Sequence, residues 1–206
     1  MIQFITHYTE SISYLDSAMY ALRGGCKWIQ LRMKDVSDEE VRPVAETLLE
    51  ECRRHGAVMI IDDRVALAKE IGADGVHLGH DDMPIAEARA VLGGKYIIGG
   101  TANTLEDVMR IYEGGGDYVG CGPYRFTTTK KKLSPVLGTD GYRRILDGMK
   151  AHGIELPVVA IGGIELDDVA ILKNTGVAGI AISGAVIRSV SPEETMRNFI
   201  NAEKRV

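Results

Sequence analysis

Eight short apolar segments recur along this chain of 206 residues, and each is followed by a segment with helical character. The apolar segments are rich in Val, Ile or aromatic residues. They occupy residues 2–6, 28–33, 58–62, 75–79, 96–100, 117–122, 157–163 and 179–184. Strands that are buried on both faces have this composition, because helices cover both faces of a parallel sheet.

The segments between them carry signals for the start and end of helices. Residues 37–56 begin with Ser37 followed by acidic residues and end at Gly56, and residues 191–204 open with Ser-Pro. A polar cap, acids in the first turn and a terminal glycine are typical of helices. Helices are therefore expected within residues 11–25, 37–56, 64–72, 82–94, 104–116, 139–153, 165–176 and 191–204.

This alternation predicts the fold class, a single (β/α)8 barrel that spans residues 1–206 as one domain. No linker, low-complexity tract or change of composition divides the chain. An open doubly wound sheet is the alternative, but it usually has fewer strands and a glycine fingerprint in its first turn, which this sequence lacks.

Net charge and cysteine content argue against a nucleic-acid-binding protein and against a disulfide-rich secreted protein. The net charge of −5 argues against nucleic acid as a partner. The three cysteines are far apart and form no CxxC pair, which favours a reducing, cytoplasmic location over a disulfide scaffold. The N-terminus does not resemble a signal peptide, and no apolar run is long enough to span a membrane.

Polar residues gather where the predicted strands end, which is the catalytic end of such barrels. In chain order these residues are His7; Gln30, Arg32 and Lys34; Asp62 and Asp63; His77 and Asp82; Thr101 and Asn103; the loop GPYRFTTTKKK at 122–132; Gly163; and Ser183. Each has a structural alternative. Arg32 and Lys34 could form surface salt bridges, Asp62 and Asp63 could cap the next helix, and His7 and His77 could be core histidines.

The residue types in this set predict two anion sites. Asp63 and Asp82 suit Mg²⁺, which proteins usually hold with one or two carboxylates and substrate phosphates. Arg32, Lys34 and Lys130 are the cations that can surround those phosphates and act in catalysis. Gly163 and Ser183 suit a monophosphate site built from backbone N–H groups at the last two strands. No activated nucleophile is evident, and a reaction whose leaving group is a diphosphate needs none.

In these residues the chain resembles the thiamine-phosphate synthase (thiamine-phosphate pyrophosphorylase) family, in order and over nearly its whole length. The shared patterns are Q-L-R-x-K at 30–34, the D-R of N-D-R at 63–64, G-x-H-L-G at 75–79 with Asp82, G-x-G-P-x-x-x-T-x-T-K at 120–130 and A-I-G-G-I at 160–164.

The resemblance implies a TIM barrel that joins a hydroxymethylpyrimidine diphosphate to a thiazole phosphate and releases pyrophosphate by a dissociative route. It implies that Mg²⁺ binds at Asp63 and Asp82. The implied pyrimidine diphosphate contacts are Gln30, Arg32, Lys34, Asp62, Thr101 and Lys130. The implied thiazole phosphate contacts are Thr127, Thr128, Thr129, Gly163, Ile182 and Ser183. The partners expected are these small molecules, with neither nucleic acid nor membrane, and a homo-oligomer stays open.

Three departures from the family pattern keep alternatives open. Asp62 stands where the family usually has Asn, Thr101 where it has Ser, and the last strand ends AISGA. That ending favours the paralogous thiazole tautomerase, an isomerase whose catalytic histidine follows the fifth strand. Asn103 occupies that position here and cannot act as a general base. A non-catalytic regulator that binds thiamine precursors is the third reading.

Overall fold

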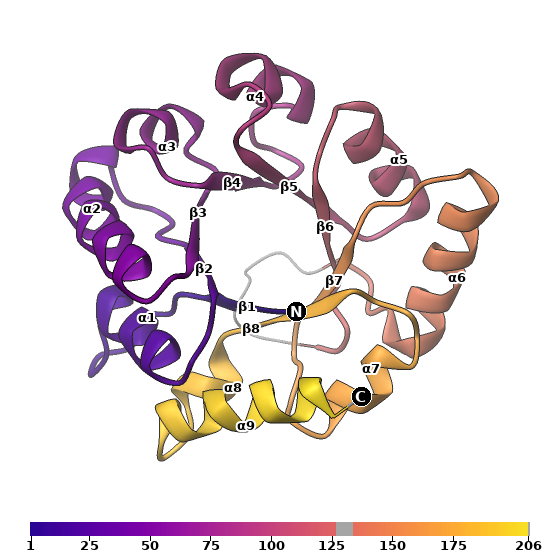
Figure 1. Ribbon diagram of the computed structural model, residues 1–206. Coiled ribbons are helices and arrows are strands. Elements are labelled where there is room, and N and C mark those ends of the chain that lie inside the picture. Colours follow the sequence, from indigo (N-terminus) through magenta and orange to yellow (C-terminus); the bar gives the residue numbers. More distant parts are fainter. Residues whose placement is uncertain (127–133, 206) are drawn as a thin grey trace.

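Eight parallel strands close into a barrel in the computed structural model, which describes residues 1–126 and 134–205 (Figure 1). The strands are β1 Ile2–Ile5, β2 Trp28–Leu31, β3 Val58–Asp62, β4 Gly75–Leu78, β5 Ile97–Ala102, β6 Tyr118–Cys121, β7 Val158–Ile161 and β8 Gly179–Ile182. Each strand pairs with the next, and β8 pairs with β1. The predicted closed (β/α)8 barrel is therefore confirmed.

Helices surround the strands as an outer ring, as Figure 1 shows. In the described chain they are α1 Tyr14–Arg23, α2 Asp38–Arg54, α3 Val65–Ile71, α4 Ile85–Leu92, α5 Leu105–Glu113, α6 Gly138–Ala151, α7 Asp168–Lys173, α8 Gly184–Ile187 and α9 Pro192–Lys204. The cap expected at Ser37 forms, and Thr104 caps α5 in the same way, because each side chain accepts the N–H of the residue three positions on. Ser191 is the N-cap residue of α9, but among the described residues its side chain makes no capping hydrogen bond. None of the described helices is long and apolar enough to cross a bilayer.

Most strand ends differ from those predicted by one or two residues, and four of these differences affect predicted site residues. β7 ends at Ile161 and β8 at Ile182, so Gly163 and Ser183 follow their strands. β2 ends at Leu31, so Arg32 and Lys34 follow the strand rather than alternate within it. β5 continues to Ala102, because Thr101 and Ala102 pair with β6. The four-residue helix α8 was not predicted.

Glycines allow large side chains to fill the inside of the barrel. A Cβ added at Gly99 would lie 2.1 Å from the ring of Tyr118, and one at Gly120 would lie 2.8 Å from the His77 ring. Tyr118 packs there with Ile5, Ile60, Val159 and Ala181 in a small buried cluster. The barrel interior is therefore solid beneath its mouth, and the strand ends are left to form a cavity.

Candidate active site

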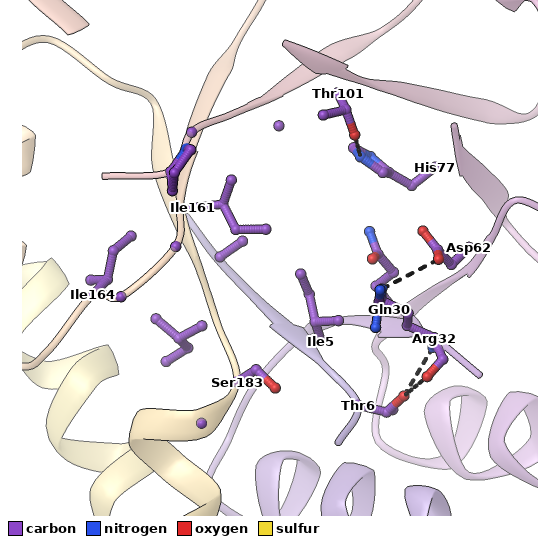
Figure 2. A pocket seen from close by; sticks show the side chains of 18 of the residues that line it. Ile5, Thr6, Gln30, Arg32, Asp62, His77, Thr101, Ile161, Ile164 and Ser183 are labelled. Carbon is purple, nitrogen blue, oxygen red and sulfur yellow. Dashed lines mark hydrogen bonds and ion pairs between the residues drawn. The ribbon is translucent and has the colours of Figure 1, made fainter. Parts of the chain in front are cut away.

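A cavity opens at the carboxyl ends of the strands, where the sequence predicts the site (Figure 2). Nine predicted residues line it: Gln30, Arg32, Lys34, Asp62, Asp82, Thr101, Gly163, Ile182 and Ser183. Asp63 is not among its lining residues. Thr127, Thr128, Thr129 and Lys130 lie outside the described residues. The predicted residues that are described thus come from segments far apart in the sequence, and nine of them line the same cavity.

Arg32 and Lys34 form ion pairs with a buried carboxylate inside the cavity. Arg32 Nε lies 3.5 Å and Lys34 Nζ 3.0 Å from Asp62 Oδ2, and Lys34 Nζ also donates to Asp63 Oδ2. The Asp62 side chain is only 8% exposed. These cations therefore pair with a buried carboxylate rather than with surface neighbours, and both line the cavity.

Burial and charge act in opposite directions on this cluster. Burial raises the pKa of Asp62 above its usual value, although Lys34 and Arg32 favour its charged form. Burial alone would lower the pKa of Lys34, but Asp62 and Asp63 hold it above its usual value. Lys34 is therefore a cation at neutral pH, and its charge is already partly balanced by carboxylates.

Asp63 and Asp82 have separate structural settings. Asp63 has a left-handed backbone, with φ of 60°, and its N–H donates to the His77 carbonyl at 2.8 Å. Asp82 Oδ2 accepts the Gly79 N–H at 2.6 Å. Neither Asp62 nor Asp63 caps α3, because its N-cap residue is Arg64 and, within the described chain, no side chain caps it. Both carboxylates are thus held by the loops after β3 and β4.

The two carboxylates fit a cation that shares its ligands with a substrate. Among residues 1–126 and 134–205, no group of three or more His, Cys, Asp and Glu side chains could hold a metal alone. Burial is the first cause that raises the pKa of Asp62 and of Asp63. Asp82 adds to the rise at Asp62, and Asp62 adds to the rise at Asp63, as carboxylates in one negative region would. Hard oxygen ligands in this number suit Mg²⁺ completed by water and phosphate oxygens.

His77 links the barrel interior to the cavity wall. Its Nδ1 lies 2.9 Å from Tyr118 Oη, its Nε2 lies 2.9 Å from Thr101 Oγ1, and Gln3 Nε2 donates to Tyr118 Oη at 3.2 Å. His77 is buried, which agrees with the reading of a satisfied core histidine. This network also holds the Thr101 hydroxyl at the cavity. No sequence pattern pointed to Tyr118 or Gln3.

The turn after β7 has a backbone that glycine adopts more readily than other residues. Gly162 and Gly163 both have positive φ, of 97° and 68°. Arg125 holds this turn, because its guanidinium donates to both Asp168 oxygens at 2.7 Å and to the Gly163 carbonyl at 3.2 Å. Beside the turn, Ser183 Oγ is buried without a hydrogen-bond partner among the described residues. An unsatisfied buried hydroxyl of this kind is suited to a ligand oxygen.

Neither the Asn103 side chain nor the three cysteine thiols is available for acid–base or nucleophilic catalysis. Asn103 Nδ2 donates to the carbonyls of Gly122 and Pro135, at 3.0 and 2.9 Å, so this side chain holds the loop after β6. Burial raises the pKa of Cys26 to about 11 and those of Cys52 and Cys121 to about 12. These thiols are protonated at neutral pH and cannot serve as nucleophiles there.

Comparison with known proteins identifies the family of this chain. The family model for thiamine monophosphate synthase matches residues 2–186. The chain belongs to this family. Thiamine-phosphate synthase of Phocaeicola vulgatus is 56% identical over 97% of this chain and 96% of its own length. That of Bacteroides thetaiotaomicron is 55% identical over 98% and 97%.

A solved structure supports the assignment to the thiamine monophosphate synthase family. Thiamine phosphate pyrophosphorylase from Pyrococcus furiosus superimposes with a TM-score of 0.86 at 32% identity, over 99% of this chain and 95% of that one. The resemblance found from the sequence patterns is thereby confirmed, and it extends to the whole barrel.

Proposed function

We propose that this chain joins hydroxymethylpyrimidine diphosphate to hydroxyethylthiazole phosphate, giving thiamine phosphate and pyrophosphate. The observation that carries the proposal is a single cavity with cations on its β2 side and a glycine turn and buried serine on its β7–β8 side. Such a cavity suits two phosphorylated substrates bound face to face. Membership of the thiamine monophosphate synthase family supports the same reaction.

The reaction breaks the bond between the pyrimidine methylene carbon and the diphosphate oxygen, and the electron pair leaves with pyrophosphate. The thiazole nitrogen then forms a bond to the same carbon. Arg32 and Lys34 stabilise the charge that develops on the leaving oxygen, and the hydroxyl of Thr101 donates to the pyrimidine diphosphate. Lys130 has the same proposed role as Arg32 and Lys34. Gln30 contacts this substrate from the same wall.

Asp63 and Asp82 would hold Mg²⁺, which when bound neutralises phosphate charge. On the opposite wall, Gly163, Ile182 and Ser183 bind the thiazole phosphate, and Thr127, Thr128 and Thr129 are proposed to assist them. A cavity closed by its substrates excludes water that would otherwise capture the pyrimidine cation.

The test is incubation of the purified protein with both substrates, with Mg²⁺ or with EDTA, and detection of products by mass. Thiamine phosphate should form only when both substrates and Mg²⁺ are present. Isomerisation of a thiazole carboxylate phosphate without joining would favour the tautomerase. Binding of either substrate without any product would favour a regulator. The commitment of Asn103 to two backbone carbonyls weighs against the tautomerase.

We also propose a cytoplasmic location for the protein. Three free, buried cysteines accord with a reducing cytoplasm. A homo-oligomer stays a prediction that a sedimentation measurement would check.

Asp62→Asn is expected to lower the KM for the pyrimidine diphosphate by about tenfold, because Arg32 and Lys34 would no longer be shared with a buried carboxylate. The same change should leave the Tm within about 2 °C, because the cost of burying the Asp62 charge offsets its attraction to the two cations, and Lys34 keeps Asp63 as a partner. Steady-state kinetics and thermal melting measure both effects. Asp140→Asn is the control, because that exposed residue lies on α6. A KM that rises would show that Asp62 itself contacts the substrate.

A further inference from the structure

Arg188 brings a cation to the β7–β8 side of the cavity, and no sequence pattern pointed to it. It is the C-cap residue of α8, and its side chain turns back along the helix. A Cβ at Gly184, the first residue of α8, would lie only 2.0 Å from Arg188 Nη1. Arg188 lines the cavity together with Gly163, Ser183 and Gly184. The guanidinium therefore lies beside the groups expected to bind the thiazole phosphate.

The two sides of the cavity differ in how their charge is balanced. On the β2 side, Lys34 lies 3.0 Å from buried Asp62 and also contacts Asp63. On the β7–β8 side, the charged residues among the described lining are Glu165 and Arg188, whose charged atoms are 3.7 Å apart. Both side chains are more than half exposed, at 55% and 61%. Such a pair contributes little, so the Arg188 guanidinium can turn to an anion at small cost.

The charge of Arg188 acts on His7, which follows β1. The pKa of His7 is lowered by burial first, and then by Arg188 and Arg32. His7 is therefore neutral at neutral pH and adds no positive charge of its own. Arg125 also contacts the glycine turn, but its guanidinium donates to both oxygens of Asp168, which balance its charge. The Ser183 hydroxyl is uncharged. Three cations are among the described lining residues, and of these Arg188 is the one on the β7–β8 side, whereas Arg32 and Lys34 follow β2.

We propose that Arg188 is a phosphate ligand of the β7–β8 site and sets the preference for a phosphorylated thiazole over the free alcohol. A guanidinium can donate two parallel hydrogen bonds to phosphate oxygens, which gives both charge and direction. This inference rests on the proposed function, because it assumes that a thiazole phosphate binds at Gly163 and Ser183.

The test compares two second substrates, hydroxyethylthiazole phosphate and hydroxyethylthiazole, in wild type and Arg188→Gln. The variant should lower kcat/KM for the phosphate by about 10- to 100-fold, as expected for a lost hydrogen bond to a charged group. It should leave kcat/KM for the alcohol and the KM for the pyrimidine diphosphate within twofold. Arg188→Lys should restore part of the loss, because it keeps the charge without the planar fork.

Two further variants complete the design. Arg197→Gln is the matched control, since Arg197 is also about half exposed and pairs loosely with a glutamate, at 3.5 Å, but lies on α9. Glu165→Gln should lower the KM for the phosphate, because it releases Arg188. An equal loss for the two thiazoles, or no loss for either, would overturn the assignment of Arg188. If wild type forms no thiamine phosphate at all, the proposed function fails and this inference fails with it.

Discussion

Asp63→Asn is expected to lower kcat by about 10³-fold or more while leaving the fold intact. A metal ion that polarises a leaving phosphate supplies several kcal/mol, and each 1.36 kcal/mol is a factor of ten in rate. Asparagine has almost the shape of aspartate and tolerates the left-handed backbone that Asp63 adopts, with φ of 60°. Alanine would add backbone strain there, so asparagine isolates the loss of charge.

The dependence on Mg²⁺ separates a metal ligand from a partner of Lys34. If Asp63 binds the metal, the Mg²⁺ concentration for half-maximal rate should rise in the variant. If Asp63 serves only to hold Lys34, which it contacts directly, kcat should fall at an unchanged Mg²⁺ requirement. Full activity of the wild-type protein in EDTA would refute the metal role altogether. Thermal melting and circular dichroism confirm that the variant is folded.

Gly163→Ala is expected to raise the KM for the thiazole phosphate by about 10²–10³-fold. A Cβ at this position would lie 2.5 Å from Arg125 Cγ and 2.9 Å from the Phe126 carbonyl oxygen. The turn must then shift away from the geometry that presents its N–H groups, and displacements of about 1 Å can cost 10²-fold. The KM for the pyrimidine diphosphate should change little, because the site proposed for that substrate is at the opposite wall of the cavity.

Gly56→Ala is the control for Gly163→Ala, because it introduces a similar backbone strain without a steric clash. Gly56 has φ of 58°, close to the 68° of Gly163, but nothing lies within 4 Å of its added Cβ. Both variants lose the same conformational freedom, and only Gly163→Ala meets a neighbour. If the two variants show the same kinetics, the phosphate does not bind at the Gly162–Gly163 turn.

The barrel could be predicted from sequence because its signals are local. Val- and Ile-rich segments fix the strands, and Ser37 and Thr104 mark helix starts through contacts three residues away. Helix α8 escaped prediction for the same reason. It has four residues, begins at a glycine and, within the described chain, has no side-chain cap, so its sequence carries no helical period.

The sequence predicted which residues form the site, but it did not predict the ion pairs and hydrogen bonds between them. The position of Arg32, Asp62, Gly163 and Ser183 after strands was enough to place them in one cavity. Their partners depend on distances between segments that the sequence does not encode locally. The ion pair of Lys34 with Asp62 joins residues 28 apart, and the Arg125–Asp168 pair joins residues 43 apart. Arg188 was missed because it acts through a helix that was not predicted.

The interlocked rings beneath the cavity limit how this protein could accept a bulkier pyrimidine. Tyr118 packs against the bare backbone of Gly99 and bonds His77, which in turn packs against Gly120 and orients Thr101. Shortening Tyr118 alone would open space below but leave His77 Nδ1 without that bond. Enlarging either glycine alone would force a ring into the substrate position. Redesign for larger substrates therefore has to change these residues together, and single-site libraries across the floor should yield inactive variants.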